Sequence, residues 1–184
     1  MKNYFLLIIA LSVALSGTAQ TSAEDALNIL RNHTLIVKLI VPEKKMEALL
    51  KANKKEEMLA VQKETERLHE NLIQAFYTTY TFGKVAFIYS TEMYRLAEGD
   101  ASALFDARGS PLEKLPTTWL FIELSESPQR SINGFVVRDK EHYVLSPPFP
   151  YFVSQWGFLH LSTRSFPSMI SEWQDKLNRF ALRL

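Results

Sequence analysis

The segment TLIVKLIV at residues 34–41 decides the fold, because six of its eight residues are apolar and most are β-branched. Such a run, followed by a proline at position 42, is typical of a central strand buried on both faces of a sheet. A second run of the same kind, VAFIY, lies at residues 85–89. We therefore expect two central strands, in which Val37 and Phe87 mark the buried pair.

Residues 43–80, between these two runs, have the apolar spacing of a helix. Apolar residues recur at intervals of three, four and seven, and only the stretch around Asn53 lacks them. Asn53 is therefore either a break between two helices or a weak point in one long helix. Strand, helix and strand in this order predict a βαβ unit with parallel strands and a right-handed crossover.

The second half of the chain has shorter apolar runs and more frequent turn residues. We expect strands at 102–106, 117–124, 135–138 and 142–145, the last two forming a hairpin around residues 139–141. Helices are predicted at 21–32, 90–98 and 167–182. The sequence thus predicts a single α/β domain with a mixed sheet, which combines a parallel βαβ core, a long helical crossover, an antiparallel second half and a C-terminal helix.

The first nineteen residues predict a secretory signal peptide. Lys2 supplies a positive start, an apolar run occupies residues 4–15, and Gly17 and Ala19 are small residues that suit a signal peptidase. The run is shorter than the roughly 20 apolar residues that a membrane-spanning helix needs. We expect cleavage after Ala19, which leaves one globular domain at 20–184, periplasmic or secreted, without a stable membrane span.

The composition excludes several classes of function. The chain has no cysteine, which rules out disulfides, thiol catalysis and cysteine-ligated zinc. Its formal net charge of +1 gives no reason to expect nucleic acid as a partner. The four histidines lack the spacing of a helical metal motif, so neither a metal nor a cofactor is predicted.

The motifs predict no catalytic residue. The sequence contains no nucleophile elbow, P-loop or dinucleotide fingerprint. His142 follows acidic residues in a predicted turn, which suits acid–base chemistry, but no nucleophile is identified beside it. His69 falls on the charged face of the predicted helix, where we expect it to be solvated.

The segment SPPFPYFVSQWG at residues 146–157 is the most unusual local feature. Prolines stiffen a loop, and rigid aromatic side chains lose little entropy on binding. Phe149, Tyr151 and Trp156 are therefore the predicted ligand-binding residues, on an exposed apolar patch that suits a sugar ring or an extended peptide. The alternative is that these rings close one end of the core.

Three functions remain open. The leading one is a non-catalytic periplasmic binding or interaction module that uses the aromatic segment to bind an envelope protein, a peptide or a glycan. The second is a cell-envelope hydrolase, which requires a cavity with convergent polar groups such as His142. The third is an assembly subunit that docks through the helix near residues 54–80, with Met58, Val61 and Leu68 in the contact.

Two resemblances add to these expectations. PPFPYFV at 147–153 and FGKVAFIYS at 82–90 are similar to segments of uncharacterised exported proteins of Gram-negative bacteria, which implies no particular activity. The predicted order of strand, helix, strand, helix, strand, strand and helix resembles a thioredoxin-like domain, in which a proline precedes the third strand as Pro116 does here. This second resemblance implies the fold without redox chemistry, because the chain has no cysteine.

Export is testable at the N-terminus of the mature protein. We expect mass spectrometry of the periplasmic fraction of a Gram-negative host to find Gln20 as the first residue. Replacing Leu7 and Ile9 with arginine should keep the full-length chain in the cytoplasm, because each charge in an apolar membrane segment costs about 2.5–3.5 kcal/mol. Valine at the same two positions is the matched control. Detection of the arginine variant in the periplasm would contradict the signal peptide.

Overall fold

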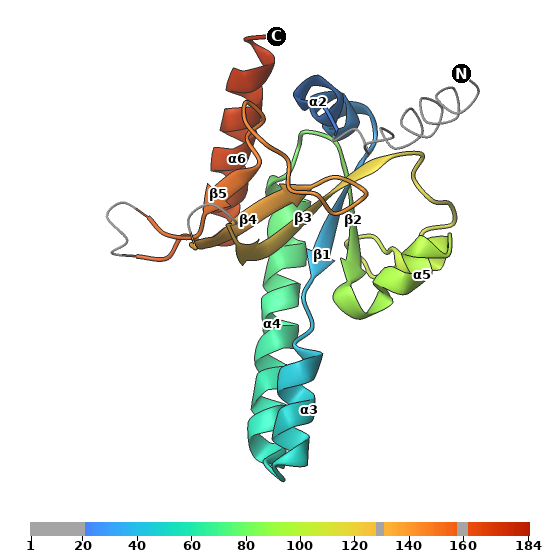
Figure 1. The fold of residues 1–184 in the computed structure, drawn as a ribbon, viewed down its shortest axis with the longest axis vertical. Coiled ribbons are helices and arrows are strands. Elements are labelled where there is room, and N and C mark those ends of the chain that lie inside the picture. Colours follow the sequence, from blue (N-terminus) through green and yellow to red (C-terminus); the bar gives the residue numbers. More distant parts are fainter. Residues whose placement is uncertain (1–20, 128–130, 158–161) are drawn as a thin grey trace, which may run out of the picture.

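The computed structural model describes residues 21–127, 131–157 and 162–184. The predicted signal peptide at residues 1–19 lies outside these ranges. The described chain forms one α/β unit with a five-stranded mixed sheet, and helices cover both faces of the sheet (Figure 1). Its strands are β1 (Thr34–Leu39), β2 (Lys84–Tyr89), β3 (Trp119–Glu126), β4 (Asn133–Arg138) and β5 (Phe152–Ser154). Its α-helices are α2 (Ala23–Asn32), α3 (Glu43–Lys51), α4 (Lys55–Thr79), α5 (Met93–Ala97) and α6 (Phe166–Ala181).

Strand β1 lies in the interior of the sheet, whose order is β2-β1-β3-β4-β5. It pairs in parallel with β2, where Val37 is opposite Phe87, and in parallel with β3, where Val37 is opposite Ile122. Strand β4 pairs antiparallel with β3 on one side and antiparallel with β5 on the other. The predicted parallel pair, the mixed sheet and the antiparallel second half are therefore confirmed.

Alternate residues of β1 enter two separate hydrophobic clusters. Leu35, Val37 and Leu39 face a large core that α2, α4 and α6 complete. Ile36 faces the other side, where a smaller core contains residues of β2, β3, α5 and the 3₁₀ turn at Ala101–Ala103. This arrangement explains the near-continuous apolar run, because a strand covered on both faces leaves few positions for polar residues. Lys38, the one charged residue of β1, is partly exposed and pairs with Glu123.

The helical segment is interrupted at Asn53, which agrees with one of the two alternatives predicted for it. Helix α3 ends at Lys51, α4 begins at Lys55, and Asn53 has a φ of 57°. Asparagine tolerates this left-handed conformation better than most residues do. The two helices therefore turn back on each other instead of forming a single rod.

The C-terminal helix packs against α4 on the large core, as Figure 1 shows. The Ser165 side chain accepts a hydrogen bond from the Ser168 backbone N–H, and Pro167 occupies the first turn. Trp173, which is fully buried, stacks on Tyr80 and donates its indole N–H to the Pro150 carbonyl at 2.7 Å. The indole therefore links the end of α4 to the proline-rich segment.

Two expected strands are reduced to isolated bridges. Within 102–106 the chain forms a 3₁₀ turn at Ala101–Ala103, followed by a single antiparallel bridge between Phe105 and Phe87 of β2. The Asp100 carboxylate accepts a hydrogen bond from the Ser102 backbone N–H, which stabilises the turn over a regular strand. The predicted hairpin around residues 139–141 forms, but its second strand is reduced to a single antiparallel bridge between Val144 and Arg138. His142 has a φ of 69° in the turn after Asp139, and the regular partner of β4 is β5.

Adjacent residues of α4 provide a test of the core. Phe76 is fully buried, with its ring centroid 5.5 Å from that of Phe135, whereas Tyr77 is 58% exposed. We expect Phe76→Ala to lower the free energy of unfolding by about 3–5 kcal/mol. We expect Tyr77→Ala to change it by less than about 0.5 kcal/mol. Urea unfolding of both variants measures the difference, and equal losses would place the core elsewhere.

Candidate functional site: a groove along α4

A pair of helices projects from the sheet. Figure 1 shows α3 and the first half of α4 running side by side away from the strands. We call residues 43–68 of this hairpin the arm. In the described structure the arm contains no buried side chain, because α3 has none and the buried positions of α4 begin at His69. The second half of α4 is anchored in the large core by Leu72, Ala75 and Phe76.

The apolar side chains of the arm therefore stay accessible to solvent. Leu50, Leu59 and Leu68 are 52%, 48% and 39% exposed, while Met46, Leu49, Met58 and Val61 are half-buried. Helices in proteins obtain most of their stability from packing an amphipathic face. The arm makes only part of this packing within its own chain.

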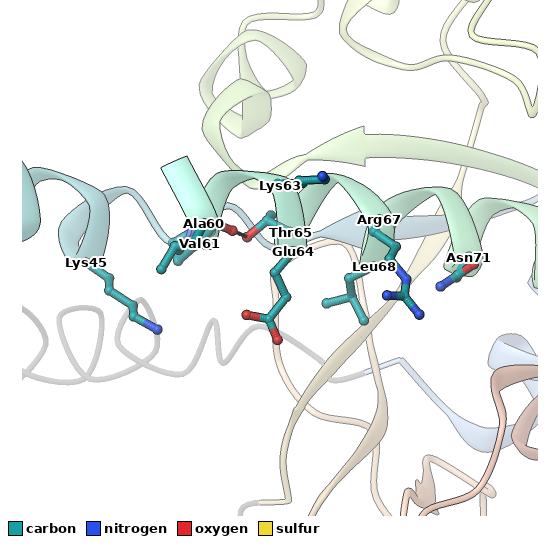
Figure 2. Close-up of a pocket in the computed structure, with 10 residues that line it drawn as sticks. Lys45, Ala60, Val61, Lys63, Glu64, Thr65, Arg67, Leu68 and Asn71 are labelled. Carbon is teal, nitrogen blue, oxygen red and sulfur yellow. Dashed lines mark hydrogen bonds between the residues drawn. The ribbon is translucent and has the colours of Figure 1, made fainter. Parts of the chain in front are cut away.

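A cavity of about 800 Å³ lies where α3 starts beside α4. Pro42 and Lys45 line one side of it, and α4 supplies the other side from Ala60 to Asn71. Figure 2 shows Glu64, Arg67 and Leu68 pointing to the same side of α4. The floor is thus made of short or apolar side chains, with charged groups along the edges.

A second cavity, of about 430 Å³, continues the first along α4. Asn71 lines both cavities, and the second extends past Ala75 and Thr78 to Phe166 and Arg164 at the start of α6. We call the two cavities together the α4 groove. It joins the arm to the α4–α6 junction along a single helix.

The charges around the α4 groove are mainly basic. Its lining contains Lys45, Lys63, Arg67 and Arg164 against the single carboxylate of Glu64. Arg164 is paired with Glu172. Among the described residues no ion pair involves Lys45, Lys63 or Arg67. By contrast, Lys51 and Lys54 at the tip of the arm pair with glutamates within the arm.

His69 lies at the root of the arm, and its predicted solvation is wrong. Only 6% of the residue is exposed, its Nε2 is 3.0 Å from the Ile40 carbonyl oxygen, and its ring packs against Tyr89 with centroids 5.6 Å apart. Burial lowers the pKa of His69, although the Ile40 carbonyl and the charge of Glu66 oppose the shift. The uncharged ring therefore serves as a packing contact between α4 and the ends of β1 and β2.

A carboxylate on the other side of the sheet is held by two cations. Glu123 is 6% exposed, and its two oxygens lie 3.0 Å from Lys38 Nζ and 2.7 Å from Arg138 Nε. Burial alone would raise the pKa of Glu123, but the hydrogen bonds and charges of Lys38 and Arg138 hold it below its ordinary value. This network links β1, β3 and β4 and leaves Glu123 with both oxygens occupied.

His142 stacks on Phe121 with ring centroids 4.8 Å apart. Partial burial and the charge of Lys38 lower the pKa of His142. Across the described residues, the best-formed cavities lie away from this ring. The hydrolase hypothesis therefore has no support from these cavities, and the described part of the chain contains no cluster of groups able to hold a metal ion.

The aromatic segment is divided between core and surface. Phe149 is 2% exposed and packs edge-on against Phe180, so the prediction of Phe149 on an exposed patch is wrong. Tyr151 is half-buried and lines a cavity of about 490 Å³, and Trp156 is 38% exposed. Phe149 lines the same cavity as Tyr151, and a role of Phe149, Tyr151 and Trp156 in ligand binding stays a prediction.

Sequence reasoning located part of the α4 groove. Val61 and Leu68, which were expected in a docking surface on this helix, line the groove, whereas Lys45, Asn71 and Phe166 were not identified. One local signal in the sequence was the scarcity of apolar residues around Asn53. A helical segment with few apolar residues cannot bury a continuous face, so this scarcity indicated exposed helices near the groove.

Comparisons with known proteins leave the chain without an assigned family. No family model matches it, and neither a curated protein nor a solved structure is detectably similar to it. Within the described ranges, every helix is too short or too polar to cross a membrane.

The buried histidine gives a test of stability against pH. Because the pKa of folded His69 lies below its ordinary value of 6.5, the unfolded chain takes up the proton first as the pH falls. We expect the free energy of unfolding to be highest above that value and to decline as the pH falls from about 7.5 to about 5. Urea titrations should show a smaller decline for His69→Gln than for a His33→Gln control. Equal declines would contradict the burial of the His69 ring.

Proposed function

We propose that the protein is a non-catalytic interaction module that docks a partner protein in the α4 groove. The observation that carries this proposal is the arm, whose 26 residues form two helices in the described structure without a single buried side chain. A partner that covers the groove supplies the apolar contacts that the chain does not make by itself.

The physical argument rests on apolar area. Each square ångström of apolar surface removed from water contributes about 25 cal/mol, so covering the exposed parts of Val61 and Leu68 favours association. Contiguous exposed apolar surface with a polar rim is typical of interaction sites. The α4 groove has this composition, with Leu68 at 39% exposure between Lys45 and Arg67.

We propose that this docking takes place outside the cytoplasm, in the periplasm or after secretion, on an envelope protein. The support is the N-terminal pattern of one lysine, a short apolar run and the small residues Gly17 and Ala19. The absence of cysteine is compatible with this location, because the fold then does not depend on the redox state of its surroundings.

The thioredoxin-like resemblance also enters as a proposal. Its support is that β1, α4, β2, α5, β3, β4 and α6 follow one another in this order, with β1 in the interior of the sheet and Pro116 ahead of β3. The chain departs from that pattern by the additional α3 and β5 and by the parallel pairing of β3 with β1. In open α/β sheets, ligands bind beyond the carboxyl ends of the parallel strands. The arm leaves the sheet at that edge, directly after β1. Docking through the arm therefore uses the edge of the sheet at which such folds carry their sites.

Two leucines on α4 provide a matched test. Leu68 lines the groove, whereas Leu59, 48% exposed, lies on another side of the helix. Both Leu68→Asp and Leu59→Asp should change the free energy of unfolding by less than about 1 kcal/mol, because neither side chain is buried. A photo-crosslinking residue at position 64 should yield one defined adduct in the producing cells. Leu68→Asp should abolish that adduct, and Leu59→Asp should leave it unchanged.

Three results would contradict the proposal. One is an adduct that survives Leu68→Asp, which would mean that the crosslink does not report groove binding. Another is an equal loss with Leu59→Asp, which would indicate a general effect of charge on the arm. The third is the absence of any adduct from position 64.

A further inference from the structure

The α4 groove follows the axis of one helix. Its lining positions on α4 run from Ala60 to Thr78, which corresponds to about 27 Å at 1.5 Å per residue. The positions Val61, Leu68 and Ala75 recur at intervals of seven, so they form one stripe along the groove. A ligand that fills the groove is therefore elongated and lies along α4.

The groove favours a helical ligand over an extended one. The backbone groups of α4 are used inside the helix, so the floor has few partners for the unpaired N–H and C=O groups of an extended peptide. A helix satisfies its own backbone and presents an apolar stripe at intervals of three, four and seven residues. Small residues on the floor, Ala60 and Ala75, allow two helices to approach to the usual 8–10 Å.

The charged side chains at the edges of the groove favour a ligand helix of one sign of charge. Lys45 on α3 and Arg67 on α4 are exposed cations that take part in no ion pair among the described residues. Figure 2 shows Glu64 between them along the groove. Carboxylates at the edges of a bound helix would meet Lys45 and Arg67, whereas lysines there would meet like charges. The start of α6 at the far end adds the positive end of a helix dipole, whereas Arg164 there is already paired with Glu172.

We propose that the occupant of the α4 groove is an acidic amphipathic helix of a partner protein, which places its apolar stripe on Val61 and Leu68 and its carboxylates against Lys45 and Arg67. This inference rests on the proposed function and names the chemistry of the partner. A second copy of this chain docking by the same groove would bring these cations against their own counterparts, so the charge pattern disfavours it.

Synthetic helices test the inference directly. The probe is a fluorescent peptide of about 18 residues, long enough to span the groove, with leucines at helical spacing and glutamates elsewhere. Its counterpart has lysine at every glutamate position. We expect the glutamate peptide to bind the full-length mature chain about tenfold more tightly than the lysine peptide in anisotropy titrations, and the difference to shrink as salt rises from about 50 to about 300 mM.

Variants of the chain assign the preference to the groove. Lys45→Glu and Arg67→Glu should each weaken binding of the glutamate peptide by about threefold to tenfold, and the double variant should prefer the lysine peptide. Glu64→Gln should strengthen binding of the glutamate peptide, because it removes the one opposing carboxylate of the lining. Leu68→Asp should abolish binding, and Leu59→Asp, on another side of α4, should leave it unchanged.

Other outcomes would overturn the inference. Equal affinity for both peptides, no binding of either, or a preference that persists in the Lys45→Glu, Arg67→Glu double variant would each exclude selection by charge. A dimer in sedimentation velocity that dissociates on Leu68→Asp would assign the groove to a second copy. If the peptides fail while the crosslink from position 64 remains sensitive to Leu68→Asp, the docking function stands and only the acidic helix is wrong.

Discussion

The burial of β1 on both faces is the constraint on which the rest of the structure depends. A strand with neighbours on both edges and apolar residues on both faces needs a helical layer on each side of the sheet. Helices α2, α4 and α6 form one layer, and α5 with the adjacent 3₁₀ turn forms the other. The parallel pairing of β1 with β2 then requires a long crossover, because the chain must return to the edge of the sheet at which β1 begins.

That crossover is longer than the sheet needs, and the excess is the arm. Only the second half of α4 packs on the large core, whereas α3 and the first half of α4 extend beyond it (Figure 1). The turn at Asn53 folds this excess back on itself, so two partly exposed helices lie side by side. The buried His69 marks the boundary, since its uncharged ring closes the core at the root of the arm.

Charge is distributed differently in the body and in the arm. On the sheet, Lys38 and Arg138 neutralise the buried Glu123, so the ions there serve the fold. Along the α4 groove, Lys45 and Arg67 have no such counterpart among the described residues. Unpaired cations beside accessible apolar side chains cost little in water and become favourable contacts when an anionic surface covers them. The aromatic segment differs again, because Phe149 and the carbonyl of Pro150 are tied into the core by Phe180 and Trp173.

The sequence by itself determined the two central strands, the helical crossover and the C-terminal helix, because hydrophobic periodicity and turn chemistry act locally. At Asn53 it left two alternatives, a break or a weak point in one helix, and the structure decided for the break. Local hydrogen bonds by Asp100 and a left-handed His142 reduced the strands expected at 102–106 and 142–145 to single bridges, and apolar content does not reveal such competition. Only the tertiary structure decided which apolar side chains remained exposed. Phe149 and Leu68 look equally apolar in the sequence, yet Phe149 is 2% exposed against α6 and Leu68 is 39% exposed in the groove beside the start of α3. Burial depends on contacts between segments far apart in the chain, so the α4 groove appears only when α3, α4 and the start of α6 are placed together.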